Sequence, residues 1–208
     1  MALVHSFSPQ KNSIIGYWKF EESVDDLIAR VEDLHFNLEK FYLINSTNRK
    51  IEWLSTRLLL HELLPENNCD IYYSEFGKPH LSSTNKHISI SHSKGMCAMY
   101  IGDQSNGVDL QILNNNIESI AHKYLDNSEL KLIQSQLEDY HILWCTKEAV
   151  FKAYGRKKIF LKKNIFVQSI NKTENKVVAQ LIDENYTQNY LLKYLYFENY
   201  YLVYTLNV

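Results

Sequence analysis

Several residue types are scarce in this chain of 208 residues. It has six glycines and three prolines, which is too few for a long flexible linker between separate domains. Its three cysteines, Cys69, Cys97 and Cys145, lie far apart and form no C-x-x-C pair. We therefore expect reduced thiols in a cytoplasmic protein, without a thiolate metal site.

Long apolar runs and an excess of one charge are also absent. No stretch approaches the roughly 20 apolar residues that a membrane helix needs. The first residues, MALVHSFSP, have no cationic start followed by an apolar run, so they do not resemble a secretory signal. The net charge of −2 predicts no general affinity for nucleic acid or for membranes.

The composition is that of a folded protein, and its periodicity is mixed. Hydrophobic residues make up 45% and aromatic residues 13% of the chain, enough for a sizeable core. The first twenty residues suggest strand and turn. Helical spacing of apolar residues covers 23–34, 46–64, 117–139 and 144–155. Strand-like runs cover 71–73, 87–91, 96–101, 107–112, 164–170, 176–182, 190–197 and 200–206.

Helices are thus followed by strands twice along the chain. This order predicts an α+β fold of two similar halves, each with helices packed on an antiparallel sheet. We place the boundary near residue 110, with domains 1–110 and 111–208. Ser46 or Thr47 is suited to cap the second helix, and Ser128 the second part of the third.

The helix expected over 144–155 combines charged and apolar faces. Trp144, Glu148 and Lys152 recur at four-residue steps, so they project from one side. Leu143, Val150 and Ala153 lie mostly on the opposite side and can face a core. By itself this pattern is also that of an ordinary surface helix with a Glu–Lys pair, which stabilises by only about 0.3–0.5 kcal/mol.

The strand expected over 107–112 carries candidate metal ligands. Asp109 and Gln111 point to the same face because side chains alternate along a strand, although an aspartate at a strand end is also a common turn residue. With Glu148 they supply two carboxylates and an amide oxygen, a hard set of ligands suited to Mg²⁺. Lys147 and Lys152, which flank Glu148, are candidates for holding a phosphate bound to that metal.

Other polar residues are candidate phosphate ligands, each with an ordinary structural alternative. Ser91 and His92 stand with Ser93 ahead of a glycine, where they could bind phosphate, although a lone histidine near a strand end is more often packed or hydrogen-bonded. Lys78 adds a cation to a turn that Pro79 stiffens.

Basic residues elsewhere in the chain are further candidates. Arg49 and Arg57, eight residues apart on the second helix, are either solvated or able to grip a phosphate. Residues 147–163 hold seven basic side chains and one acid. This stretch is either a solvated face or a docking surface for an acidic partner.

Four motifs together resemble those of a known family. Gly77-Lys-Pro79, Ile90-Ser-His-Ser93, Gly107-Val-Asp-Leu-Gln111 and Trp144-x-x-Lys-Glu-x-x-x-Lys152 stand in the order and approximate spacing of the 4′-phosphopantetheinyl transferases. The chain is most similar to the longer, surfactin-synthetase-activating type. Gly-x-Asp alone is unspecific, but the tryptophan motif about 35 residues later makes the combination specific.

The resemblance implies a fold and a reaction. The fold would be a monomeric pseudo-dimer of two α+β halves, with coenzyme A bound in the cleft between them. The reaction would be transfer of the 4′-phosphopantetheine arm of coenzyme A to a serine of an apo acyl or peptidyl carrier protein, an acidic partner. It would release 3′,5′-ADP and use Mg²⁺ on the pyrophosphate.

The resemblance also implies roles for single residues. Asp109 and Glu148 would be catalytic metal ligands, and Lys152 would contact the pyrophosphate and could protonate the leaving phosphate. His92 and Arg49 would hold phosphates of coenzyme A and Lys78 would lie beside its adenine, with Ser91 a weaker candidate for the phosphate cluster.

One position departs from the family pattern. The family's metal motif often ends in glutamate where this chain has Gln111. An amide can ligate Mg²⁺ but brings no charge, so we expect weaker metal binding rather than inactivity.

Two other functions are compatible with the same residues. The departure at Gln111 suggests a coenzyme A-binding module without transferase activity. Asp109 and Glu148 would also suit a metal-dependent phosphohydrolase or nuclease, but nucleases are usually basic and this chain is not. The motifs leave open whether Glu148 or a bound water takes the serine proton. They also do not say whether the carrier belongs to fatty acid, polyketide or peptide synthesis.

Overall fold

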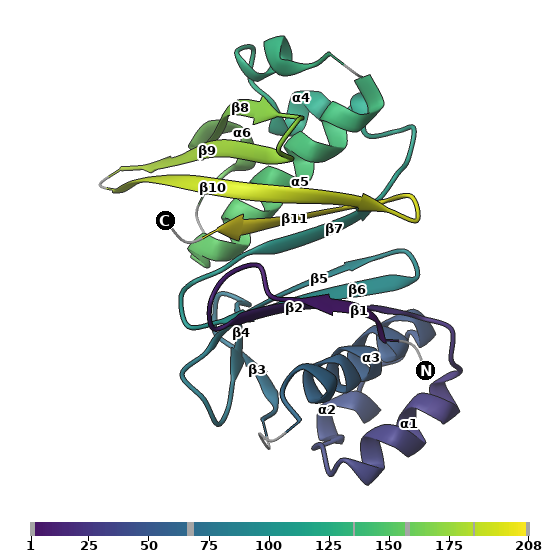
Figure 1. The fold of residues 1–208 in the computed structure, drawn as a ribbon. Coiled ribbons are helices and arrows are strands. Elements are labelled where there is room, and N and C mark those ends of the chain that lie inside the picture. Colours follow the sequence, from purple (N-terminus) through teal and green to yellow (C-terminus); the bar gives the residue numbers. More distant parts are fainter. Residues whose placement is uncertain (1–2, 66–68, 135, 157–158, 185, 207–208) are drawn as a thin grey trace. The chain divides into compact units, whose positions relative to one another are not determined.

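The computed structural model describes residues 3–65, 69–134, 136–156, 159–184 and 186–206. The chain divides into two compact units, Met1–Asp103 and Gln104–Val208. Each unit is an antiparallel sheet with helices (Figure 1), which confirms the predicted α+β class. The three cysteines are buried free thiols, and within the described ranges no helix is both long and apolar enough to cross a membrane.

The first unit is built on a six-stranded sheet in the order β1-β2-β6-β5-β4-β3. Its strands are β1 (Leu3–Phe7), β2 (Ser13–Lys19), β3 (Ile71–Tyr73), β4 (Pro79–Leu81), β5 (His87–Ser93) and β6 (Met96–Gly102). Its helices are α1 (Val24–Asp33), α2 (Glu39–Tyr42) and α3 (Thr47–Leu63). The long helix α3 packs on β2 and β6 and carries α1 on its other side (Figure 1).

Local signals explain where these helices begin. Ser23 caps α1 through a capping box, in which its side chain accepts the N–H of Asp26 while the Asp26 carboxylate accepts the N–H of Ser23. The Ser46 hydroxyl accepts the N–H of Arg49 at the start of α3, as the sequence predicted.

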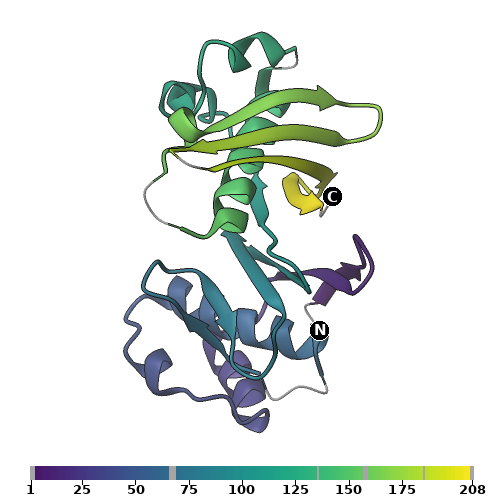
Figure 2. The same ribbon diagram turned by 90° about the vertical axis from the view of Figure 1, so that its left-hand side faces the viewer.

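The second unit is built on a five-stranded sheet in the order β7-β11-β10-β9-β8. Its strands are β7 (Val108–Ile112), β8 (Ile165–Asn171), β9 (Lys176–Asp183), β10 (Tyr186–Phe197) and β11 (Tyr200–Leu206). Its helices are η1 (Glu118–Ile120), α4 (Ala121–Tyr124), η2 (Glu129–Leu132), α5 (Gln136–Tyr154) and α6 (Leu161–Asn164), of which η1 and η2 are 3₁₀ turns. The long helix α5 lies across one face of this sheet (Figure 2). Its residues Leu143, Val150 and Ala153 enter the core as predicted.

The two units share a topology. In both, the strand before the helices pairs with the last strand, and the strands between follow in reverse chain order. The series β2-β6-β5-β4-β3 therefore corresponds to β7-β11-β10-β9-β8, with α3 corresponding to α5. This agrees with the predicted similarity of the two halves, and β1 is an addition to the first.

The division of the chain differs from the expected one. A boundary after residue 110 would cut β7, which pairs with β11 and so belongs to the second sheet. The structure divides the chain between Asp103 and Gln104 instead. The strand over 107–112 was correctly expected, but local periodicity does not say which distant strand it pairs with.

The region expected to be helical over 117–139 is largely made of short turns. Ser128 makes no side-chain cap. Its N–H and hydroxyl both donate to the carboxylate of Asp126, at 2.7 and 2.6 Å, which favours a turn over a longer helix. The next long helix, α5, begins at Gln136, eight residues before Trp144.

A glycine allows β7 and α5 to approach closely. A Cβ atom on Gly107 would lie 1.9 Å from the carbonyl oxygen of Ala149 and 2.9 Å from the nitrogen of Ala153. No side chain fits there, because both contacts are with the helix backbone. In the first unit Gly16 of β2 faces α3. A Cβ atom on Gly16 would have a side-chain carbon of Leu63 as its nearest neighbour, at 2.8 Å.

We predict that Gly107→Ala destabilises the protein by about 3 kcal/mol or more, because the helix would have to move away from the strand. Gly16→Ala should cost only about 1–2 kcal/mol, because the Leu63 side chain can change rotamer. Urea unfolding of the two variants and the wild type measures this difference. Equal losses at both sites would show that the contact between β7 and α5 is not rigid.

Candidate active site

The centre of the candidate site is an ion pair between β7 and α5. Lys152 Nζ lies 2.7 Å from Asp109 Oδ1 and donates to the carbonyl of Val108 at 3.1 Å. The Asp109 side chain is 8% exposed and that of Lys152 is 24% exposed. The pair therefore lies at the edge of the core, where the ammonium can still meet a solute.

Glu148 lies one turn before Lys152 on α5 and feels the charge of Asp109. Burial and, to a smaller extent, the charge of the Asp109 carboxylate raise the pKa of Glu148, the Lys152 ammonium lowers it, and the net value is about 7. The structure therefore brings together the three residues predicted to be catalytic. Lys152 forms its ion pair with Asp109, while Glu148 interacts electrostatically with both residues.

Cys145 supports this arrangement from the helix side. It is fully buried, and burial, the charge of Asp109 and a hydrogen bond to Asp109 all raise the pKa of its thiol. The thiol thus stays protonated and helps to hold the carboxylate in place. Sequence reasoning missed this role, because a single cysteine three residues before the glutamate carries no signal of its own.

Gln111 shares the strand face of Asp109. In the pairing of β7 with β11, Asp109 lies opposite Val203 and Gln111 opposite Tyr201, and the alternating residues Val108 and Leu110 are buried. Gln111 is half-buried, and the alternation of side chains places it on the same face of the sheet as Asp109.

The donor set fits a hard divalent cation. No group of three His, Cys, Asp or Glu side chains suited to a metal occurs in the described part of the chain. Mg²⁺, however, takes only one or two protein carboxylates and completes its shell with water and substrate phosphates. Asp109 and Glu148 provide two such carboxylates, and their mutual repulsion is what a cation would relieve.

Lys147 is not at this site, contrary to the expectation that it would hold a phosphate. Its side chain is 0% exposed and its Nζ lies 2.7 Å from Glu129, which is also 0% exposed. It also donates to the carbonyls of Leu161 at 3.1 Å and Ile165 at 2.6 Å. A fully buried ammonium whose donors are all used serves the fold, joining α5 to η2, α6 and β8.

Trp144 is a packing residue. It is partly buried against the core, and its ring meets that of Tyr124 edge-on at 5.0 Å. It shares a helix face with Glu148 but contributes apolar contact rather than chemistry.

In the first unit, the structure separates two of the predicted phosphate ligands. His92 Nε2 lies 2.9 Å from the hydroxyl of Thr56 on α3. Ser91 precedes His92 in β5 and therefore points to the opposite sheet face, where it is buried. The two are not brought together.

Arg49 and Lys78 lie at separate places in this unit. Arg49 is exposed on α3, 3.8 Å from Glu52, on the helix face that also carries Thr56, the partner of His92. Lys78 lies in the turn before β4. Gly77, in the same turn, has a positive φ of +78°. Burial lowers the pKa of Lys78.

Arg57 is neither solvated nor at the surface. It is 2% exposed, and its guanidinium lies 3.3 Å from the centre of the Trp53 ring and 3.3 Å from Asp70. Helical geometry turns Arg57 toward β3, away from the face that carries Arg49 and Thr56.

Within the described residues of the basic stretch over 147–163, one lysine does not reach the surface. Lys147 is buried, and Lys157 and Lys158 lie outside the described residues. Lys162 and Lys163 are exposed on α6, where Lys162 Nζ donates to the carbonyl of His122 at 2.9 Å.

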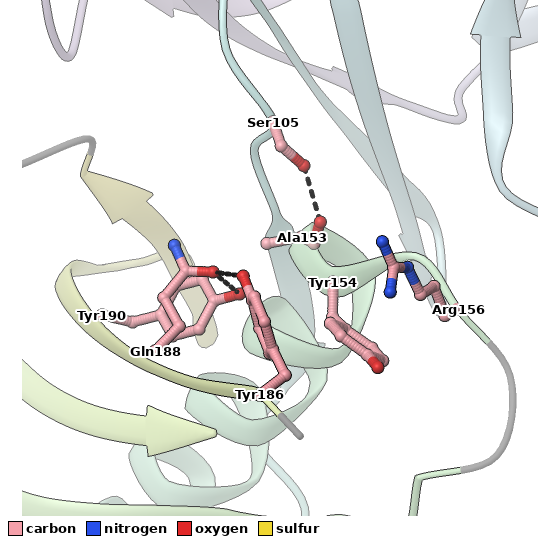
Figure 3. A pocket seen from close by; sticks show the side chains of 7 residues that line it. All are labelled: Ser105, Ala153, Tyr154, Arg156, Tyr186, Gln188 and Tyr190. Atoms are coloured by element: carbon pink, nitrogen blue, oxygen red, sulfur yellow. Dashed lines mark hydrogen bonds between the residues drawn. The ribbon is translucent and has the colours of Figure 1, made fainter. Parts of the chain in front are cut away.

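A polar pocket of about 120 Å³ opens where α5 ends. Figure 3 shows the ring of Tyr154 between Tyr186 and Arg156. The hydroxyl groups of Tyr186 and Tyr190 both donate to the side-chain oxygen of Gln188 (Figure 3).

The other polar groups of this pocket tie α5 to its surroundings. The Tyr154 hydroxyl donates to Asp183 at 2.8 Å, and that of Ser105 to the carbonyl of Ala153 at 2.6 Å. Because these hydroxyl groups bond to the protein itself, the pocket fixes the end of α5 just beyond Lys152. No sequence motif indicated it.

Comparison with known families gives a match that lies in the second unit. Residues 105–205 match the family model described as the 4′-phosphopantetheinyl transferase superfamily. The match spans the ion pair of Asp109 with Lys152 and nearly all of the second unit. It confirms the resemblance for this unit at the level of the superfamily, which transfers phosphopantetheine from coenzyme A to carrier proteins. No protein of curated function matches the chain.

The raised pKa of Glu148 predicts a pH-dependent stability. In EDTA, no metal ion binds at the site, and the folded state favours the neutral carboxyl of Glu148. The contribution of this preference to the free energy of unfolding is complete below the ordinary pKa of 4.5 and is lost as pH rises through about 7. Glu148→Gln stays neutral at every pH. The variant should therefore gain stability over the wild type between pH 4.5 and pH 7, measured as the difference in Tm.

The matched control is Glu138→Gln on the exposed first turn of α5. Its Tm should follow that of the wild type across the same pH range. Parallel curves for Glu148→Gln and the wild type would contradict the burial of a charged Glu148 beside Asp109.

Proposed function

We propose that this chain transfers the 4′-phosphopantetheine arm of coenzyme A to a serine of an apo carrier protein, releasing 3′,5′-ADP in a Mg²⁺-dependent reaction of the longer, surfactin-synthetase-activating type. The observation that carries the proposal is the cluster of Asp109, Glu148 and Lys152. It is partly accessible, and it lies inside the segment that matches the superfamily.

Asp109, Glu148 and the amide oxygen of Gln111 are the groups that would hold the metal. When bound, Mg²⁺ supplies positive charge to the pyrophosphate oxygens of coenzyme A. The residues that would hold it come from β7 and α5, two elements whose backbones are in contact at Gly107, so their relative positions are well defined.

Lys152 is placed to act on the leaving group. Its ammonium is partly exposed and already binds an anionic oxygen, that of Asp109, at 2.7 Å. A phosphate oxygen of coenzyme A can take a similar position, with a hydrogen bond from the same ammonium. In the reaction, the bond between the phosphorus that bears pantetheine and the bridging oxygen of the pyrophosphate breaks, and that oxygen leaves as part of 3′,5′-ADP. Lys152 stabilises or protonates that oxygen.

Glu148 is placed to act on the nucleophile. The serine oxygen of the carrier forms the new bond to the phosphorus that bears pantetheine, and its proton must leave. The Glu148 carboxylate, one helical turn from Lys152, accepts that proton. Positioning and charge neutralisation then account for most of the rate gain, as in other phosphoryl transfers.

Residues of the first unit and of α6 would make the remaining contacts with the substrates. We assign the phosphates of coenzyme A to His92 and Arg49, with Ser91 a weaker candidate, and the vicinity of its adenine to Lys78. The exposed Lys162 and Lys163 on α6 would face the acidic carrier.

The alternative is a module that binds coenzyme A without turning it over. It is motivated by Gln111, which brings one negative charge fewer to the metal than the family's usual glutamate. This alternative predicts coenzyme A binding and no change in any carrier.

Intact-mass spectrometry of an apo acyl carrier protein, incubated with this protein, coenzyme A and Mg²⁺, tests the proposal. The carrier should gain about 340 Da, the mass of one phosphopantetheine delivered by phosphoryl transfer, and EDTA should prevent the gain. Glu148→Gln should abolish transfer while Glu138→Gln, the same change on the same helix, keeps it. No gain with several carriers, together with demonstrated coenzyme A binding, would favour the binding module.

Gln111→Glu should restore the missing charge and lower the Mg²⁺ concentration needed for half-maximal transfer several-fold. Gln168→Glu adds the same charge at an exposed position of β8 and should leave the requirement unchanged. If both variants need as much Mg²⁺ as the wild type, Gln111 is not a ligand of the metal.

A further inference from the structure

A second pocket, unrelated to the residues assigned above, lies in the first unit. It has a volume of about 210 Å³ and is formed where α3, the start of α2 and the edge strand β3 meet. Its lining residues are Asn37, Glu39, Lys40, Trp53, Arg57, Asp70, Ile71, Tyr72 and Ser82. The match to the transferase superfamily does not extend to this unit.

Arg57 lines this pocket as a buried cation with poor partners. It is 2% exposed, and burial lowers its pKa to about 10. Its NH1 and NH2 groups reach the carbonyls of Trp53 and Ile71 only at 3.4 and 3.5 Å, beyond the usual 2.7–3.2 Å of such bonds.

Asp70 does not complete the coordination of this cation. Its Oδ1 lies 3.3 Å from Arg57 Nε, yet among the described residues this nitrogen has no hydrogen-bond partner of acceptable geometry. The same oxygen accepts the N–H of Ile71 at 2.6 Å. Within the described part of the chain, the five guanidinium N–H groups thus face three acceptors at 3.3–3.5 Å, so an occupant with two acceptor oxygens would improve their bonding.

The walls of the pocket suit a flat apolar group. The Arg57 guanidinium lies 3.3 Å from the centre of the Trp53 ring, and Tyr72 lines the pocket with 49% of its surface exposed. A cavity of about 150 Å³ lined by apolar side chains holds benzene. The volume here of about 210 Å³ therefore admits one aromatic ring with a small substituent.

The charge around the pocket limits the occupant to a single negative charge. Lys40 and Glu39, both exposed, offset each other at the mouth, and Arg57 is only partly neutralised by Asp70. Glu39 and Asp70 line the pocket and would repel a dianionic phosphate more strongly than a ligand with one carboxylate group, which can pair with the guanidinium fork.

We propose that this pocket binds a small aromatic monocarboxylate, with its carboxylate on Arg57 and its ring against Tyr72, beside the Trp53 ring that the guanidinium covers. The proposal does not depend on the transfer reaction, because none of the residues assigned to coenzyme A lines this pocket. Its occupant is defined by a planar apolar ring and one carboxylate.

The test is ¹⁹F NMR of 4-fluorobenzoate with the full chain, and of 4-fluorobenzamide as its uncharged counterpart. The acid should show saturable line broadening, and the amide should bind roughly tenfold or more weakly, because it lacks the charge-assisted bonds. Tyr72→Ala should weaken binding of the acid several-fold. Tyr196→Ala, which removes a similarly exposed tyrosine in the second unit, should not.

Arg57→Gln should abolish binding of the acid, provided that circular dichroism shows a folded protein. If it does not fold, Tyr72→Ala and the comparison of acid with amide still decide. Equal binding of acid and amide, an unchanged affinity in Tyr72→Ala, or no saturable broadening would overturn the proposal. Displacement of 4-fluorobenzoate by coenzyme A would do so too, because the pocket would then be part of the coenzyme site.

Discussion

The candidate site depends on the contact between the backbones of β7 and α5. Residue 107 has no side chain, and any Cβ atom there would overlap the carbonyl oxygen of Ala149. This close approach sets Asp109, two residues further along the strand, within 2.7 Å of Lys152. A wider spacing would leave each charge buried without its partner, at a cost of several kcal/mol. The glycine of the Gly-x-Asp motif therefore acts through packing.

The electrostatics of the site follow from that spacing. Asp109 and Glu148 bring two negative charges and Lys152 one positive charge to a partly buried place. Burial, with the charge of Asp109 as a smaller cause, raises the pKa of Glu148 to about 7 against the opposing charge of Lys152. The cluster thus has an excess of negative charge. This favours the binding of a divalent cation, either alone or together with a phosphate group. A fully neutral cluster would lack this property.

Much of the fold follows from local signals, and the exceptions share one cause. Ser23 and Ser46 cap helices as their positions suggest, because a cap requires only a few neighbouring residues. The pairing of β7 with β11 joins strands about 90 residues apart, which no local pattern encodes. The expected helix after Ser128 fails for a similar reason. The carboxylate of Glu129 is drawn into the core by Lys147, 18 positions away.

The same limit explains why three basic residues that looked alike in the sequence serve different purposes. Lys147 is buried with Glu129 and two carbonyls at 2.6–3.1 Å, so it has no donor left for a ligand. Lys152 keeps 24% of its side chain exposed and can meet a substrate. Arg57 is buried like Lys147, but its acceptors stand at 3.3 Å or more. The distances from a buried cation to its hydrogen-bond acceptors therefore distinguish a structural residue from a ligand-binding one better than the presence of the cation does. Those partners come from distant parts of the chain.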